Sequence, residues 1–313
     1  MNHRVLVTGA AGFAGSYVVE ALAGYADTIG WTHLAPPPPG VAPRAEWQRV
    51  DLLNPTEVRD AVARIKPSAV IHCAGAPNVA HSWRDTVTPL SVNVLATHHL
   101  LDALRRARVS CRVVVPGSAT VYAPSMDALT EQSPVGPSNP YATSKLAQEQ
   151  LALRAAEEDG LELIVTRSFN HTGPRQSAAF AAPNMARQIA MIEKRLAEPV
   201  IKVGNLDAQR DFTDVRDMAR AYVTLMRNGT PSTIYNVSSG VARVMRSVLD
   251  ALAARSTVDV LIETDPALMR PNDVPLMLGD STKLRRETGW HPEIPFDQTL
   301  DDLLNYWRGV ITA

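Results

Sequence analysis

Short apolar runs rich in β-branched residues recur along the first half of the chain. They lie at Arg4–Thr8, Ala69–Cys73, Arg112–Pro116 and Leu161–Arg167. Longer segments with helical spacing of apolar positions lie between them, at Pro55–Ile65, Pro89–Ala107 and Tyr141–Glu158. Strands that alternate with helices in this way are typical of βαβ units. The pattern therefore predicts an α/β fold with a doubly wound parallel sheet covered by helices on both faces.

The second half of the chain has a less regular pattern. It predicts helices at Pro183–Ala197, Asp214–Met226 and Asp297–Val310, and a strand at Thr233–Val237. Core-like elements that return after an irregular stretch indicate a chain that leaves its first domain, returns and leaves again. We therefore predict a main domain of residues 1–174 with return segments at about 211–240. Residues 175–210 and 241–313 would form a smaller C-terminal α/β lobe.

A glycine-rich turn follows the first predicted strand directly. Gly9, Gly12 and Gly15 have the spacing G-x-x-G-x-x-G and open a predicted helix. Gly9 permits the tight turn, Gly12 lets the backbone approach a pyrophosphate, and Gly15 lets the helix pack closely on the strand. The phosphates would then meet free N–H groups at the positive end of the helix. This turn predicts a Rossmann-type NAD(P)-binding domain.

The end of the second strand bears on the choice between the two nicotinamide cofactors. A carboxylate about 20 residues past the glycines would hold a ribose 2′-hydroxyl and favour NAD. The strand ends instead at Thr32 and His33, which could meet a 2′-phosphate together with Arg44. Asp51 and Leu52, after the third strand, are placed to contact adenine. We therefore predict NADP as the preferred cofactor, with NAD as the alternative.

A serine, a tyrosine and a lysine form the candidate catalytic group. Tyr141 and Lys145 are four residues apart on a predicted helix, so both face the same side. A nearby ammonium lowers the pKa of a phenol, and the phenol can then give a proton to a carbonyl oxygen during hydride transfer. Ser118 follows the strand Arg112–Pro116, at the sheet edge where ligands bind. A tyrosine–lysine pair on an ordinary helix surface is the alternative interpretation, which the order of the motifs disfavours.

Composition and charge exclude several classes of function. The 313 residues carry a formal net charge of −1, which disfavours binding to nucleic acid. The two cysteines, Cys73 and Cys111, lie in apolar runs and match no metal-ligand spacing, so we expect buried thiols and no metal site. No apolar stretch reaches the ~18 residues of a membrane span, and the first strand leaves no room for a signal peptide. We expect a cytoplasmic enzyme.

Several segments together resemble one enzyme family, and the resemblance covers essentially the whole chain. The segments are Gly9–Gly15, Ala74-Gly75, Asn93, Gly117–Tyr122, Tyr141–Lys145, Phe169–Gln176, Gly204–Phe212 and Arg270–Asp273. They are similar to extended short-chain dehydrogenases/reductases of the NAD-dependent epimerase/dehydratase family, and within it to the GDP-4-keto-6-deoxy-mannose reductases and GDP-mannose 4,6-dehydratases. The resemblance implies a GDP-linked nucleotide sugar as the substrate, bound by the second lobe.

The resemblance also implies roles for individual residues. Phe13, Ala74, Gly75 and Asn93 would contact the cofactor, and Lys145 would hold its nicotinamide ribose. The residues implied in substrate binding are Thr120, Asn170, Arg187, Lys194, Arg210 and Arg270. Arg210 and Arg270 would clamp the pyrophosphate through paired bonds. Lys194 could equally be a solvated surface charge. A homodimer is the expected assembly.

One departure from the family pattern separates the possible reactions. In the dehydratases a glutamate stands two residues after the catalytic hydroxyl and removes a proton, whereas Thr120 stands there in this chain. A threonine hydroxyl is not a base at neutral pH. We therefore favour NAD(P)H-dependent reduction of the C4 ketone of a GDP-4-keto-6-deoxy-hexose, with Tyr141 as general acid. The alternatives are a nucleotide-sugar 4-epimerase with tightly bound NAD and a non-catalytic NAD(P)-binding regulator, against which the intact Ser118, Tyr141 and Lys145 argue.

Overall fold

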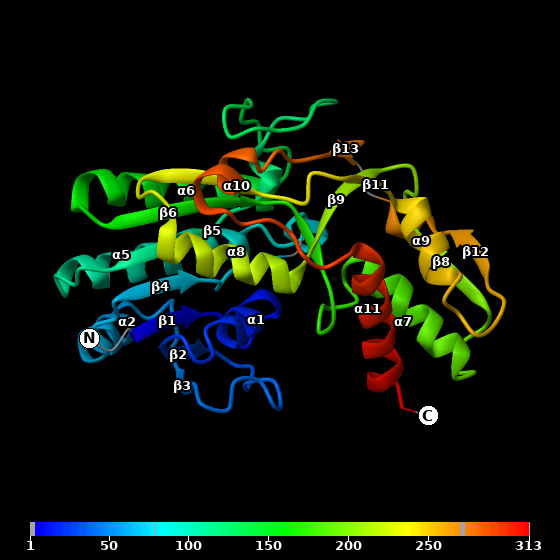
Figure 1. The fold of residues 1–313 in the computed structure, drawn as a ribbon, viewed down its shortest axis with the longest axis horizontal. Coiled ribbons are helices and arrows are strands. Elements are labelled where there is room, and N and C mark those ends of the chain that lie inside the picture. Colours follow the sequence, from blue (N-terminus) through cyan, green and yellow to red (C-terminus); the bar gives the residue numbers. More distant parts are fainter. Residues whose placement is uncertain (1–3, 78, 270–272, 313) are drawn as a thin grey trace.

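A seven-stranded parallel sheet forms the centre of the main domain (Figure 1). The computed structural model describes residues 4–77, 79–269 and 273–312. The strands are β1 (Arg4–Thr8), β2 (Asp27–Thr32), β3 (Glu46–Arg49), β4 (Ala69–His72), β5 (Arg112–Pro116), β6 (Glu162–Ser168) and β10 (Thr233–Val237). Their order across the sheet is β10-β6-β5-β4-β1-β2-β3. This order reverses direction between β1 and β4, where Rossmann-type sheets bind their ligands. The predicted fold class is confirmed.

Helices cover both faces of this sheet. One face carries α1 (Phe13–Ala21), α8 (Val215–Asn228) and α10 (Thr282–Thr288). The other carries α2 (Pro55–Ile65), α5 (Ala96–Arg106) and α6 (Pro140–Asp159). Because both faces are covered, the central strands are apolar at consecutive positions rather than alternating, as in Val113–Val115.

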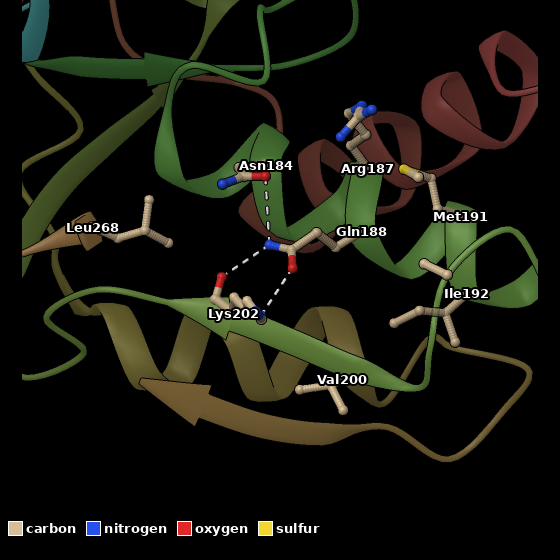
Figure 2. A pocket seen from close by; sticks show the side chains of 9 residues that line it. Asn184, Arg187, Gln188, Met191, Ile192, Val200, Lys202 and Leu268 are labelled. Atoms are coloured by element: carbon tan, nitrogen blue, oxygen red, sulfur yellow. Dashed lines mark hydrogen bonds between the residues drawn. The ribbon is translucent and has the colours of Figure 1, made fainter. Parts of the chain in front are cut away.

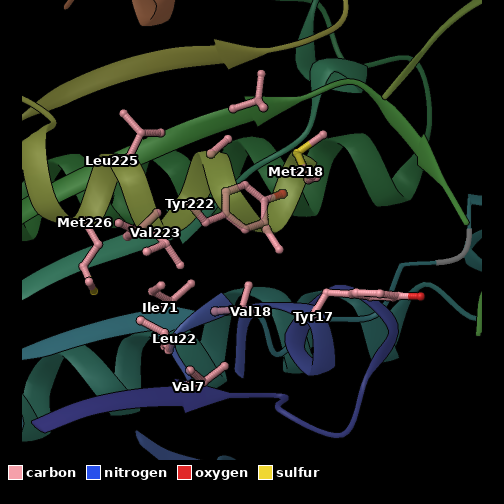
Figure 3. Packing of buried hydrophobic residues seen from close by; sticks show 14 of the residues in the cluster. Val7, Tyr17, Val18, Leu22, Ile71, Met218, Tyr222, Val223, Leu225 and Met226 are labelled. Atoms are coloured by element: carbon pink, nitrogen blue, oxygen red, sulfur yellow. The ribbon is translucent and has the colours of Figure 1, made fainter. Parts of the chain in front are cut away.

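The α1–α8 face illustrates how the core is built. Tyr222, Val223 and Met226 of α8 lie on the side that faces Val18 of α1 and Leu22 just after it (Figure 3). All five side chains are buried. Their spacing of three and four residues puts them on one stripe of each helix. The same packing fixes the start of α1, and with it the glycine turn.

The remaining elements form a smaller lobe beside the sheet. The lobe contains β7 (Asn170–Thr172), β8 (Val200–Val203), β9 (Gln209–Asp214), β11 (Ala242–Val244), β12 (Leu261–Thr264) and β13 (Leu276–Met277). Its helices are α7 (Ala181–Glu193), α9 (Met245–Ala253) and α11 (Phe296–Val310), with the 3₁₀ turn η3 (Pro266–Leu268). β9 pairs with β7, β11 and β13, and β8 pairs with β12. α7, α9 and α11 enclose the apolar core of the lobe.

Two predicted helices differ from the observed ones. The segment Pro89–Ala107 is divided into α4 (Val87–Pro89), a π-helical stretch η1 (Leu90–Leu95) and α5. The segment Pro183–Ala197 begins earlier as α7 and ends at Glu193, since Arg195 adopts a left-handed backbone with φ 57°. No helix within residues 4–77, 79–269 and 273–312 combines the length and apolar character needed to cross a membrane.

Candidate functional site

The carboxyl ends of β1, β4 and β5 meet the starts of α1 and α6 at one edge of the parallel sheet. Thr8 ends β1, His72 ends β4 and Pro116 ends β5. The glycine turn, the segment after β4 and Ser118 follow these strands directly, so the topology brings three predicted motifs to one edge. This edge is where ligands bind in open α/β sheets.

The glycine turn has no room for larger side chains. Gly9 adopts φ +62°, and a Cβ there would lie 2.6 Å from the Ala74 nitrogen. A Cβ on Gly15 would lie 2.2 Å from the Gly9 oxygen, so this glycine permits the close approach of α1 to the turn. Gly12 is the N-cap of α1 and supplies no side-chain cap, which leaves the first helical N–H groups for a ligand. The turn therefore fits a dinucleotide pyrophosphate.

The π-helical stretch η1 positions the predicted cofactor residue Asn93. This buried side chain accepts a hydrogen bond from the Ala76 nitrogen at 2.8 Å and donates to Ser144 Oγ at 2.9 Å. Ser144 in turn donates to the Tyr141 carbonyl at 2.7 Å. A Cβ on Gly75 would come within 3.0 Å of Asn93 Oδ1. Asn93 thus ties the segment after β4 to the first turn of α6.

The residues predicted to bind adenosine lie at the ends of β2 and β3 and just after them. Thr32 ends β2 and is half-buried, and His33 Nε2 lies 4.0 Å from Asp51 Oδ1. Asp51 also accepts a hydrogen bond from the Leu53 nitrogen at 2.9 Å, and Leu52 packs at the edge of the apolar core. Arg44 is exposed. The strand end therefore presents a histidine and a hydroxyl where NAD-specific sites present a carboxylate.

Ser118 and Thr120 lie together at the end of β5. Ser118 is the N-cap of the 3₁₀ turn η2 (Ala119–Val121), and its Oγ lies 2.9 Å from Thr120 Oγ1 and accepts from the Thr120 nitrogen at 3.3 Å. Ser118 is also hydrogen-bonded to the phenol of Tyr141. The two hydroxyls and the phenol thus form one cluster, and no carboxylate of the described residues is hydrogen-bonded to it.

Tyr141 lies in the first turn of α6, whose start is determined by its capping residues. The Asn139 side chain accepts from the Ala142 nitrogen at 2.8 Å, and Pro140 occupies the first helical position. The Tyr141 nitrogen donates to Ser82 Oγ at 3.2 Å, which links α6 to α3 (Val79–Ser82). Burial raises the pKa of Tyr141, and the hydrogen bond to Ser118 opposes this rise.

Lys145 lies one turn further along α6 and is buried. Its Nζ donates to the Pro116 carbonyl at 2.6 Å and to Gln148 Oε1. Burial lowers the pKa of Lys145 to about 8, while Cys73 and Glu149 partly oppose this shift. The expected lowering of the Tyr141 pKa by Lys145 is therefore corrected: burial raises this pKa, and the interaction that opposes the rise comes from Ser118 rather than from Lys145.

The turn after β6 packs on α1. Phe13 stacks on His171 with ring centroids 5.8 Å apart, and burial lowers the pKa of this histidine. The guanidinium of Arg175 lies 3.6 Å from the centre of the Tyr17 ring, and the Tyr17 hydroxyl donates to the Pro174 carbonyl. Asn170 is exposed at the start of β7. Phe13 is thus held between the glycine turn and the predicted substrate segment.

The predicted substrate residues of the lobe fall into three environments. Arg210 on β9 is ion-paired with Asp273 at 2.6 Å and donates to the Val274 carbonyl at 2.7 Å. Lys194 caps the end of α7 and donates to the Ile311 carbonyl. Arg270 lies outside the described residues.

Arg187 lines a pocket of about 310 Å³ between α7 and β8 (Figure 2). Gln188 bridges the two elements there: its amide accepts from the Lys202 nitrogen at 2.8 Å and donates to the Lys202 carbonyl at 2.9 Å. The other residues that line it are Asn184, Met191, Ile192, Ala197, Val200 and Leu268. Lys194 is not among them, because α7 ends at Glu193 and directs it toward the end of α11.

Sequence reasoning missed several polar residues of these sites. Asp273 pairs with Arg210 from 63 residues away, and Gln148 contacts Lys145. Arg243 on β11 is the Cα partner of Arg210, and its buried Nε has no hydrogen-bond partner within the described part of the chain. Only the lobe sheet brings Asp273 and Arg243 to Arg210, whereas Gln148 lies three residues from Lys145 on α6.

The Rossmann-type sheet, the glycine turn and the cluster of Ser118, Tyr141 and Lys145 define an NAD(P)-dependent oxidoreductase of the extended short-chain dehydrogenase/reductase class. The family described as GDP-mannose 4,6 dehydratase matches residues 6–303. The chain belongs to this family.

Curated relatives cover nearly the whole chain. A GDP-6-deoxy-D-mannose reductase from Pseudomonas aeruginosa is 36% identical over 311 residues, which is 98% of each chain. A GDP-mannose 4,6-dehydratase from Vibrio cholerae is 25% identical over 97% of this chain and 93% of its own. The chain is thus similar to a reductase and, at lower identity, to a dehydratase.

Solved structures of a reductase and an epimerase also match the chain over nearly its whole length. RMD from Pseudomonas aeruginosa, complexed with NADPH, matches with a TM-score of 0.86 and 33% identity over 99% of this chain and 100% of its own. A UDP-glucose 4-epimerase from Thermus thermophilus in complex with NAD matches with a TM-score of 0.87 and 29% identity over 98% and 100% of the two chains. Both of these structures bind a nicotinamide cofactor, in agreement with the predicted NADP or NAD.

Proposed function

We propose that the protein reduces the C4 ketone of a GDP-4-keto-6-deoxy-hexose to a GDP-6-deoxyhexose with NADPH. Thr120 carries this proposal. It stands where dehydratases of the family have a glutamate, and its hydroxyl lies 2.9 Å from Ser118 Oγ. A hydroxyl at this position can hydrogen-bond the substrate but cannot remove a carbon-bound proton. The 36% identity to a GDP-6-deoxy-D-mannose reductase supports the same reaction.

The chain supplies the proton and orients the reacting groups. Tyr141 gives its phenolic proton to the ketone oxygen, and Ser118, which is hydrogen-bonded to it, orients the same oxygen. Lys145 keeps its ammonium beside this cluster and holds the nicotinamide ribose. When bound, NADPH supplies the hydride. Gly9, Gly12 and Gly15 hold the pyrophosphate, and Phe13, Thr32, Asp51, Leu52, Ala74, Gly75 and Asn93 line the rest of the cofactor site.

In this proposal the smaller lobe, which includes β7 and β9, binds the nucleotide sugar, and the domain of the seven-stranded sheet binds the cofactor. Arg210, held by Asp273, and Arg270 bind the pyrophosphate, and Asn170 borders it. The pocket that contains Arg187 offers a second charged residue, Lys202, and the two side-chain amides of Asn184 and Gln188 for the nucleotide. Lys194 contributes to the end of α7 rather than to this pocket. Homodimer formation and a cytoplasmic location stay predictions.

Cofactor stoichiometry tests the reaction. A reductase consumes one NADPH for each ketone, because the hydride leaves in the product. We expect stoichiometric loss of NADPH absorbance with GDP-4-keto-6-deoxy-mannose and none with GDP-mannose. The free keto sugar should react very poorly, since it lacks the pyrophosphate. The ratio of kcat/KM for NADPH and NADH measures the expected preference for NADPH.

The same measurement decides for or against the epimerase. Epimerases return the hydride to their substrate, so they turn over without net oxidation of the cofactor. The structural similarity to a UDP-glucose 4-epimerase is the observation that keeps this second candidate open. Turnover of a nucleotide sugar without added cofactor, by protein that purifies with tightly bound NAD, would establish the epimerase instead.

A further inference from the structure

A line of buried polar side chains connects the glycine turn to Lys145. Its members are Thr8, His72, Thr97 and Gln148, each at most 1% exposed. Thr8 Oγ1 lies 2.7 Å from His72 Nδ1, and His72 Nε2 lies 2.9 Å from Thr97 Oγ1. Gln148 Nε2 donates to Thr97 Oγ1 at 2.8 Å, and Gln148 Oε1 accepts from Lys145 Nζ. These four residues are called the Thr8–Gln148 line below.

The chemistry of its two ends assigns every proton along this line. Lys145 can only donate, so the Gln148 oxygen faces it and the Gln148 nitrogen faces Thr97. The Thr97 hydroxyl donates to the Asn93 carbonyl at 2.6 Å, which leaves its oxygen to accept from both Gln148 and His72. His72 therefore carries its proton on Nε2, and Nδ1 accepts from the Thr8 hydroxyl.

The protonation state of His72 is consistent with this assignment. Burial and, to a smaller extent, the charge of Lys145 together lower the pKa of His72 to about 3. The ring is therefore neutral throughout the working pH range. A buried network in which each member has its partners is rigid, because any rotation would leave a buried polar group unpaired. The rigid Thr8–Gln148 line ends at the side-chain oxygen of Gln148, which accepts from Lys145.

Gln148 accordingly determines where the Lys145 ammonium points. An ammonium has three N–H groups. Within the described residues, the acceptors of Lys145 Nζ are the Pro116 carbonyl and Gln148 Oε1. The third N–H thus has no acceptor among the described residues, and in the proposed function it contacts the cofactor. Both acceptors are neutral oxygens, and they stabilise the charged form of the lysine.

We propose that Gln148 is a positioning residue, which, anchored through Thr97 and His72, holds the Lys145 ammonium charged and directed toward the cofactor site. The inference rests on the role of Lys145 in the proposed function. It concerns a residue that neither touches the substrate nor belongs to the serine–tyrosine–lysine group.

Several other ionisable groups face Lys145 and bear on the test. Glu149 and Tyr141 lie on α6, and His72 and Cys73 lie at the end of β4. Glu149 is ion-paired with Arg167 of β6 at 2.6 Å, so its charge is largely compensated. His72 is neutral, and burial raises the pKa of Cys73 to about 12. The neutral carbonyl of Gln148 is therefore the direct contact through which a substitution can change the pKa of Lys145.

Two substitutions at Gln148 should move the Lys145 pKa in opposite directions. Gln148→Leu removes an acceptor from the charged form and should lower this pKa by about one unit. Gln148→Glu replaces the amide with a carboxylate of the same shape and should raise it by about one unit or more. The chain has five lysines, so ¹³C-lysine NMR of the cofactor-free protein can follow Lys145 directly, with Lys145→Arg to assign its signal.

Activity and cofactor binding provide the second readout. Because the ammonium is the required form, kcat and NADPH affinity decrease as pH rises through the Lys145 pKa. We expect the pH at which kcat and NADPH affinity decrease to be about one unit lower in Gln148→Leu and about one unit higher in Gln148→Glu. At pH 8 the charged fraction of Lys145 should decrease from about one half to about one tenth in the Leu variant, so kcat should decrease about fivefold, with an unchanged KM for the nucleotide sugar. Fluorescence titration gives the NADPH affinity without any sugar substrate.

The matched controls separate positioning from packing. Thr299→Val removes a buried hydroxyl of α11 that donates to Asp214 Oδ2 at 2.8 Å, and it should lower the Tm without moving either profile. Thr97→Val breaks the anchor of Gln148 and should shift the Lys145 pKa in the same direction as Gln148→Leu. Unchanged titration of Lys145 in both Gln148 variants, or shifts of the same sign, would overturn the proposal. If the titration shifts as expected but NADPH is not oxidised with the GDP-keto sugar, the positioning stands and the proposed function fails.

Discussion

Tyr141 is the residue on which the proposed reaction depends most directly. Burial raises the pKa of its phenol, so the proton is present at neutral pH and available for transfer. Ser118 binds the phenol from the end of β5, whereas Lys145 donates two of its N–H groups to Pro116 and Gln148. The site thus consists of the acid Tyr141, the hydroxyl of Ser118 that binds it, and the cation Lys145 one helical turn further along α6.

Replacing the phenol should therefore remove the acid and little else. Tyr141→Phe keeps the ring, and we expect kcat to decrease about 10²–10⁴-fold, the range that general acid catalysis supplies. NADPH binding should stay close to that of the wild type, because the glycine turn and Lys145 are unchanged. Steady-state kinetics and a fluorescence titration measure the two effects. A Tyr141→Phe enzyme with the wild-type kcat would contradict the mechanism.

Helix α6 is the element that carries both Tyr141 and Lys145, and its first turn is held by a cap. Asn139→Ala removes the hydrogen bond to the Ala142 nitrogen and should cost about 1 kcal/mol of stability. Because Tyr141 lies in the same turn, kcat should decrease more than the change in Tm would suggest. Thermal unfolding and kinetics at 25 °C measure both. Asn139→Asp retains a capping oxygen and should restore most of the loss; if Asn139→Ala leaves kcat unchanged, the cap does not position Tyr141.

The main elements could be predicted from the sequence to within a residue or two. β1, β5 and β10 coincide with apolar runs, because a strand buried on both faces needs apolar residues at every position. The π-helical stretch η1 was missed, since one extra residue in a turn barely alters helical periodicity. Short strands such as β7 were missed as well, because they exist only through pairing with β9. The pairing of Arg210 with Asp273 depends on that same lobe sheet.

At the scale of the whole molecule, Asp214 connects the sheet domain to the lobe. It ends β9, caps α8 through the Arg216 nitrogen at 2.8 Å, and accepts from Thr299 Oγ1 of α11 at 2.8 Å. Arg216 extends the contact to Asp302 of α11 at 2.7 Å. One buried carboxylate thus joins three elements that lie far apart in the sequence.

Loss of this carboxylate should destabilise the whole protein. Asp214→Ala leaves Thr299 and the first turn of α8 without their partner, and breaking such a buried pair costs about 3 kcal/mol or more. We expect the Tm to decrease by several degrees. Asp214→Asn keeps the cap and should lose less. Differential scanning calorimetry of the three proteins measures the effect, and equal Tm values for the wild type and Asp214→Ala would refute the role.

The enclosure of the lobe core by α11 also has a consequence for biosynthesis. Leu300, Leu303 and Leu304 complete a core that α7 and α9 begin, and the ribosome makes them more than a hundred residues after α7. Domains fold during translation from the N-terminus onward, at about 5–20 residues per second. The glycine turn and its sheet are thus available to a nascent chain several seconds before the lobe can close. A chain arrested before Phe296 would emerge able to form the cofactor half alone, with the apolar faces of α7 and α9 open to chaperones.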